Sequence, residues 1–143
     1  MVLHLTASQR DQIQREAISI YPNECCGIIF GIQSGDRRDV SLLQPADNSF
    51  DEGEQFHRFA ISPKRLIDAE RLAAERGELI LGFYHSHPDH PAKPSEFDRA
   101  NAWPFYSYVI ISVIDGRPAE MKCWKFDEQS QQFEQHEISV TSR

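Results

Sequence analysis

The stretch that decides the fold is "ELILGFYHSHPDHPAKPSEFD", from Glu78 to Asp98. Its first half is mostly apolar and is typical of a strand, whose carboxyl end carries His85 and His87. Side chains at positions i and i+2 of a strand point to the same face, so these two imidazoles lie side by side while Ser86 points away. The second half is rich in proline and predicts a loop that leads into a short helix.

The same stretch contains the donors of a metal site. A catalytic zinc site generally needs a third protein ligand and an open position for water, and Asp98 follows one turn into the predicted helix. The prolines of the loop lower the entropy cost of bringing Asp98 back to the histidines. Ser95 either caps the helix or donates to an oxyanion beside the metal. Two histidines on a strand are often only polar surface, but together with Asp98 and Ser95 they favour a metal site.

Length and composition are those of one globular domain. The chain has 143 residues, 40% hydrophobic and 26% charged, and single cores usually hold about 100 to 200 residues. We therefore expect one domain over residues 1–143. The formal net charge of −7 argues against a nucleic acid partner, because binding phosphate backbones requires clustered Lys and Arg.

Neither a membrane segment nor a secretion signal is evident. No run approaches the roughly 20 apolar residues of a membrane helix, and "MVLHLTASQRDQ" at the amino terminus lacks the long apolar core of a signal peptide. We therefore expect no membrane partner and a cytoplasmic location. Cys25, Cys26 and Cys123 are odd in number and two are neighbours, so buried thiols are expected rather than a disulfide framework. The sequence does not indicate an oligomeric state.

The remaining patterns complete a mixed α/β (α+β) order of elements. Helical spacing or capping signals predict helices over 6–20, 63–76 and 95–103, and apolar runs or alternation predict strands over 25–32, 40–43, 57–62, 78–87, 107–114, 119–126 and 133–140. Residues 45–56 are rich in acids and turn formers and predict a long loop. This order implies a single mixed β-sheet flanked by helices.

The motif resembles one from a known family. "HSHP", from His85 to Pro88, followed at the right spacing by Ser95 and Asp98, is similar to the JAMM motif of the JAB1/MPN (Mov34/MPN/PAD-1) metallopeptidases in their compact bacterial form. Glu24, in "YPNECCGIIFG", matches the place of that family's general base. The resemblance extends from about Pro22 to Phe126. It implies an MPN/JAB1 domain with an architecture related to cytidine deaminases.

The resemblance also implies a mechanism. His85, His87 and Asp98 would hold one Zn2+, which lowers the pKa of a water to about 7. Glu24 would take the proton of that water and return it to the leaving amine, while Ser95 would hydrogen-bond the tetrahedral intermediate. The expected reaction is hydrolysis of a peptide or isopeptide bond without a covalent intermediate.

Other interpretations fit these residues less well. Zinc deaminases use a His-x-Glu stretch and a Pro-Cys-x-x-Cys pair, and this sequence has neither. His90 is a possible substitute ligand, but it breaks the strand geometry and is expected to be exposed or to face substrate. A lone glutamate such as Glu24 is most often a surface charge, and only the motif gives it a role. Cys25 has no neighbour in sequence that would lower its pKa.

The resemblance further implies the class of partner. Substrates in this family are ubiquitin-like proteins, cut at or just after their carboxyl-terminal Gly-Gly, and the compact bacterial members are associated with ubiquitin-like sulfur carriers. We therefore expect such a carrier as the substrate. Two alternatives stay open: a metallopeptidase acting on an unrelated peptide of cell-wall or phage type, and a non-catalytic MPN binding module.

Overall fold

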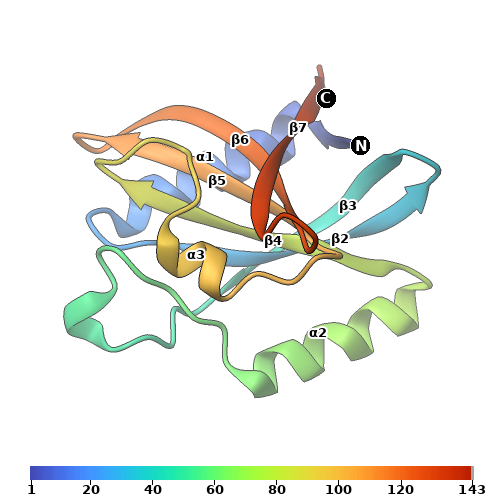
Figure 1. Ribbon diagram of the computed structural model, residues 1–143, viewed down its shortest axis with the longest axis horizontal. Coiled ribbons are helices and arrows are strands. Elements are labelled where there is room, and N and C mark those ends of the chain that lie inside the picture. The colour runs from blue at the N-terminus through green and yellow to red at the C-terminus, as the bar shows by residue number, and fades with distance from the viewer. Residues whose placement is uncertain (143) are drawn as a thin grey trace.

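A computed structural model describes residues 1–142, and within that range the strands form one mixed sheet that closes into a barrel in the order β1-β3-β2-β4-β5-β6-β7 (Figure 1). The elements along the chain are β1 (Val2–Thr6), α1 (Ala7–Ile20), β2 (Cys26–Ser34), β3 (Arg37–Ala46), the 3-10 turn η1 (Glu52–Glu54), α2 (Pro63–Arg76), β4 (Leu79–Pro88), α3 (Glu96–Ala100), β5 (Ser107–Ile114), β6 (Arg117–Asp127) and β7 (Gln132–Thr141). The predicted mixed sheet with helices is confirmed.

The two longer helices cover opposite faces of the sheet (Figure 1). α1 contacts β1 and β3 to β7, so it fills the inner, concave face, where its Ile13 and Ala17 are buried. α2 packs on the outer face, where Ala69 and Ala73 meet Phe30 of β2. Because side chains alternate along a strand, β4 turns Tyr84 to the α1 side and His85 to the outer side.

Helix α2 has the ends that its sequence predicts. The Ser62 hydroxyl accepts a hydrogen bond from the Arg65 N–H at 3.2 Å, and Pro63 occupies the first helical position. Gly77 ends the helix with a φ of 67°, a left-handed conformation that glycine adopts without steric cost. No helix in residues 1–142 is long and apolar enough to cross a membrane.

Three predicted elements differ from the structure, and one strand was not predicted. Residues 57–62 form no strand, because Ala60 hydrogen-bonds to Asn48 and Ser49 rather than to a neighbouring strand. The helix predicted over 95–103 ends at Ala100, and β3 runs from 37 to 46 instead of 40 to 43. β1 was not predicted; it pairs in parallel with β3 and β7 and closes the barrel.

Candidate metal centre and active site

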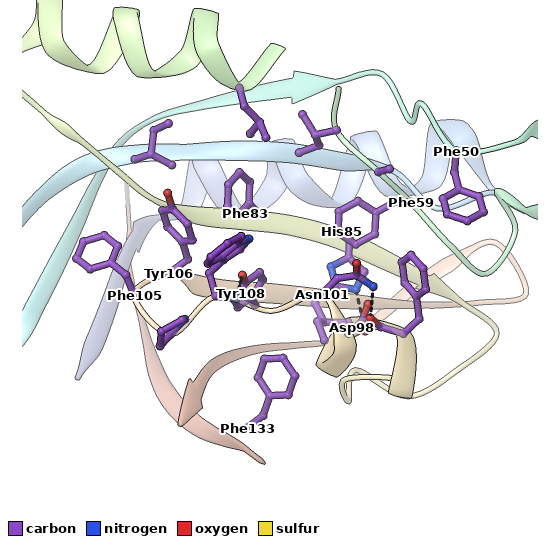
Figure 2. A pocket seen from close by; sticks show the side chains of 18 of the residues that line it. Phe50, Phe59, Phe83, His85, Asp98, Asn101, Phe105, Tyr106, Tyr108 and Phe133 are labelled. Carbon is purple, nitrogen blue, oxygen red and sulfur yellow. Dashed lines mark hydrogen bonds and ion pairs between the residues drawn. The ribbon is translucent and has the colours of Figure 1, made fainter. Parts of the chain in front are cut away.

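Three donor atoms converge where β4 ends and α3 begins. His85 Nε2 lies 3.1 Å from His87 Nε2, and Asp98 Oδ2 lies 3.2 Å and 3.1 Å from these two nitrogens. A tetrahedral zinc ion, with bonds of about 2.0 to 2.1 Å, separates its ligand atoms by about 3.3 Å. Figure 2 shows His85 and Asp98 meeting at one end of a cleft. Two imidazole nitrogens and one carboxylate oxygen at this spacing fit a zinc site.

The environment of His87 determines which of its two ring nitrogens faces the other two donors. Its Nδ1 donates to the carbonyl oxygen of Pro91 at 2.9 Å, so Nε2 is the ring nitrogen that faces Asp98. The His85 ring is buried and stacks on Phe59, with ring centroids 4.4 Å apart. Both rings are therefore held in place by groups outside the donor set.

The electrostatics of the group favour a cation. Burial would raise the pKa of Asp98, but the charge of His85 and the hydrogen bonds of His85 and His87 outweigh it and hold that pKa well below its usual range. Burial would lower the pKa of His85, but Asp98 outweighs it and raises that pKa. Asp98 is therefore a carboxylate that requires positive charge beside it.

A capping box at the start of α3 positions Asp98. The Ser95 hydroxyl accepts a hydrogen bond from the Asp98 N–H at 3.0 Å, and the Ser95 N–H donates to Asp98 Oδ2 at 2.9 Å. The sequence allowed Ser95 to be a cap or an oxyanion donor, and the structure shows the cap. A hydroxyl that accepts still carries a proton to donate, so the second role is compatible with the first.

Glu24 lies buried just before β2, with 4% of its surface exposed. Burial raises the pKa of its carboxyl to about 7; His85 and His87 oppose the shift and Asp98 adds to it. This coupling places Glu24 in the electrostatic environment of the three donors. A carboxyl with a pKa near neutrality can both accept and return a proton at neutral pH.

Two residues that were alternative candidates lie outside the site chemistry. The side chain of His90 is exposed, and its backbone carbonyl accepts a hydrogen bond from Ser112 at 2.5 Å. Cys25 is buried, and burial raises the pKa of its thiol to about 12, so the thiol stays protonated at neutral pH. A cysteine nucleophile is therefore disfavoured here.

An aromatic cleft of about 850 Å³ runs away from the donor group over the outer face of β4 (Figure 2). Trp103 and Tyr106, which follow the short helix α3, border this cleft. The other rings come from six separate segments, so no local spacing could have found them. The aromatic residues that line the cleft are Phe50, Phe59, Phe83, Phe97, Trp103, Phe105, Tyr106, Tyr108 and Phe133.

Sequence reasoning also missed the residues that support the site from behind. Ser86, between the two histidines, points to the opposite face, where its hydroxyl accepts a hydrogen bond from the Cys25 N–H at 2.8 Å. The Trp124 indole donates to the Ala92 carbonyl at 3.0 Å. The i, i+2 rule predicted that Ser86 points away, but it could not say what Ser86 would contact.

Comparisons match this chain to a family model and to proteins of similar sequence. The family model of prokaryotic homologues of the JAB domain matches residues 6–127. The desampylase of Haloferax volcanii is 34% identical over 131 residues, which cover 88% of this chain and 90% of that protein. The tail tip assembly protein K of Escherichia phage N15 is 34% identical over 91 residues, 63% of this chain but only 32% of the phage protein.

Solved structures share the fold. The protein DSY2949 of Desulfitobacterium hafniense has a TM-score of 0.84 and 30% identity, covering 100% of this chain and 94% of its own. A protein of Salinibacter ruber has a TM-score of 0.73 and 33% identity, and the match covers 98% of this chain and 91% of that protein. The JAB1/MPN domain protein AF2198 of Archaeoglobus fulgidus has a TM-score of 0.60 and 20% identity. The match covers 99% of this chain and 100% of that protein, and it supports the fold alone.

Proposed function

This chain belongs to the family of prokaryotic JAB-domain proteins, and on that premise we propose that it is a zinc-dependent hydrolase that cleaves the peptide or isopeptide bond after the carboxyl-terminal Gly-Gly of a ubiquitin-like protein. The observation that carries the proposal is the convergence of His85, His87 and Asp98 beside the buried Glu24. The 34% identity with a desampylase, over nearly the whole of both chains, supports the same class of hydrolase.

The residues divide the chemistry between them. His85, His87 and Asp98 would hold Zn2+, which would supply Lewis acidity and lower the pKa of a bound water to about 7. Glu24 accepts the proton of the attacking water at its carboxylate and returns it to the leaving nitrogen. The Ser95 hydroxyl keeps its helix-cap bond to Asp98 and donates its own proton to the oxyanion.

The cleft offers a place for an extended tail. Phe59 and Ile61 line it, and within residues 1–142 their backbone N–H and C=O groups have no hydrogen-bond partner. Ala60, between them, is bound on the other side by the Ser49 N–H at 2.8 Å. A substrate strand that adds to an edge pairs with free backbone groups at alternate residues of this kind. Gly-Gly at the scissile end suits this arrangement because glycine permits close backbone approach.

The substrate we favour is a ubiquitin-like sulfur carrier in the cytoplasm. The first test is intact mass spectrometry of carriers from the source organism, each with a short extension after Gly-Gly, incubated with the wild type, with Glu24→Gln and with chelator-treated protein. Cleavage just after Gly-Gly that requires Glu24 and metal supports the proposal. A protein that binds one zinc per chain and cleaves none of the carriers would contradict it.

The similarity to a phage tail tip protein favours a second candidate, a metallopeptidase that acts on a different peptide. That similarity covers 91 residues and 32% of the phage protein, so only part of its length is shared. The two candidates share the proposed zinc site and differ in what occupies the cleft. Cleavage of a cell-wall peptide in the same assay, without cleavage of any carrier, would favour the second candidate.

A further inference from the structure

Asn48 uses the full hydrogen-bonding capacity of its side-chain amide. Its Nδ2 donates to the Glu24 carbonyl at 3.3 Å and to the Arg58 carbonyl at 2.9 Å. Its Oδ1 accepts from the N–H groups of Phe50 at 3.0 Å and Ala60 at 3.1 Å. A primary amide has two donor hydrogens and two acceptor lone pairs, so all four positions are satisfied. One side chain thus closes the loop 47–60 and attaches it to Glu24.

The backbone around Glu24 is held from two sides. Its N–H donates to the Gln55 carbonyl at 2.7 Å, so the loop 47–60 binds both the N–H and the C=O of this residue. The next residue, Cys25, donates its N–H to the Ser86 hydroxyl at 2.8 Å and is thereby tied to β4. Because β2 begins at Cys26, Glu24 lies outside the sheet ladder and depends on these contacts.

The same loop contacts both elements that carry the donor group. The Phe59 ring stacks on His85 of β4. The guanidinium carbon of Arg58 lies 5.2 Å from the ring centroid of Phe97, and Phe50 meets that ring edge-on at 5.5 Å. Phe97 precedes Asp98 in α3. The loop therefore links Glu24, the histidine strand and the aspartate helix in one packed unit.

We propose that the loop 47–60 is a clamp that fixes Glu24 against the donor group, and that Asn48 is the positioning residue on which the clamp depends. The inference rests on the proposed function, because it assumes that Glu24 moves the proton. A base must be held within about 0.5 Å of its productive position, and a displacement of about 1 Å can cost roughly 100-fold in rate. Asn48 touches neither the donors nor the cleft-facing side of residues 59–61.

The direct test is Asn48→Asp, which has the same shape but lacks both Nδ2 donors and places an oxygen against the carbonyls of Glu24 and Arg58. We expect kcat to fall roughly 10- to 100-fold while KM changes less than about twofold and zinc affinity is unchanged. The matched control is Ser49→Ala. The Ser49 hydroxyl donates to the Ala60 carbonyl, which also accepts a hydrogen bond from the Ser49 N–H. Removing the hydroxyl therefore leaves the loop closed by the backbone bond and does not alter the contacts of Glu24. Its kcat should equal that of the wild type.

A second readout does not depend on activity. Amide hydrogen exchange, measured by NMR on metal-free protein, should be at least about tenfold faster at Glu24 in Asn48→Asp, while Cys25 keeps the wild-type rate because Ser86 still binds it. Should Asn48→Asp fail to fold, Gln55→Glu replaces it: the variant loses the Gln55 Nε2 bonds to the carbonyls of Asn48 and Phe50 and should speed exchange at Glu24 in the same way.

The outcomes separate this inference from the proposed function. If the wild type cleaves a carrier, unchanged kcat or unchanged Glu24 exchange in folded Asn48→Asp overturns the clamp. If the wild type cleaves no carrier, the proposed function fails, and the exchange data alone decide whether Asn48 holds Glu24.

Discussion

The Nδ1–H of His87 donates to the backbone carbonyl of Pro91 at 2.9 Å, so a loop residue sets the tautomer of a proposed metal ligand. Side chains hold the carbonyls on either side of Pro91. Ser112 donates to His90, and the indole of Trp124 donates to Ala92 at 3.0 Å. Consecutive carbonyls bound in this way fix the loop, and through it the ring of His87.

From this arrangement we expect Trp124→Phe to weaken zinc binding by up to roughly 10-fold. Groups that hydrogen-bond to zinc ligands typically contribute at least that much affinity, and Trp124 supports such a group because it binds the residue next to Pro91. Competition with a chromophoric chelator measures the effect. Trp103→Phe is the matched control: Trp103 is 67% exposed at the rim of the cleft and contacts no proposed ligand. Equal zinc affinity in both variants would remove Trp124 from the support of His87.

Substitutions at Glu24 and Asp98 should separate proton transfer from metal binding. Glu24→Gln keeps the shape of the side chain and removes the base, so kcat should fall by roughly 100-fold or more while the zinc content stays at that of the wild type. Asp98→Ala removes one of the three converging donors, so zinc content itself should fall. Metal analysis beside turnover assays checks both. Wild-type turnover in Glu24→Gln would exclude this residue as the base.

The sequence could predict that the three donors converge because they are close together in the chain. His85 and His87 share a face through strand periodicity, and Asp98 is brought back by a short loop and a capped helix, so spacing alone indicated their proximity. Glu24 precedes His85 by 61 residues in the sequence. Only the family resemblance connected it with the histidines and Asp98. The structure then places it beside His85 through the pairing of Cys26 with that residue.

The parts that could not be predicted depend on long-range pairing. β1 has only five residues, and its role is to bridge β3 and β7, whose positions no local pattern fixes. Residues 57–62 carry a short apolar run that predicts a strand, yet the N–H of Ala60 donates to the side chain of Asn48. Side-chain hydrogen bonds of this kind leave no periodic signal in a sequence.

Arg38 should be essential for stability. It is 1% exposed, and its guanidinium donates to the carbonyls of Leu81 at 3.1 Å and Phe105 at 2.7 Å and to the Ser107 hydroxyl at 2.8 Å. Arg38→Met keeps the length but leaves these acceptors buried without donors, which should lower the free energy of unfolding by about 3 kcal/mol. Urea denaturation measures it.

The neighbouring arginine provides the control for that measurement. Arg37 is exposed and pairs with Asp39 at 2.7 Å, and such surface pairs contribute at most about 1 kcal/mol, so Arg37→Met should change stability little. Comparable losses in Arg37→Met and Arg38→Met would show that the buried hydrogen bonds of Arg38 are not the source of its effect.

Stability should also fall in alkaline solution because of Cys123. Burial raises the pKa of this thiol to about 11, with Ser107 and Arg38 opposing the shift, against an ordinary value of 9.0. The unfolded chain therefore releases the proton first, so the stabilisation is fully present below about pH 9 and is lost as pH rises toward 11. The loss attributable to this one thiol should reach about 2 kcal/mol near pH 10.5.

Cys123→Ala removes that part of the pH dependence of stability, so urea midpoints of the wild type and the variant at pH 8 and pH 10.5 isolate it. The other buried thiols, Cys25 and Cys26, are common to both proteins and cancel in the comparison. An identical pH dependence in wild type and variant would mean that Cys123 ionises equally readily in the folded and unfolded chain.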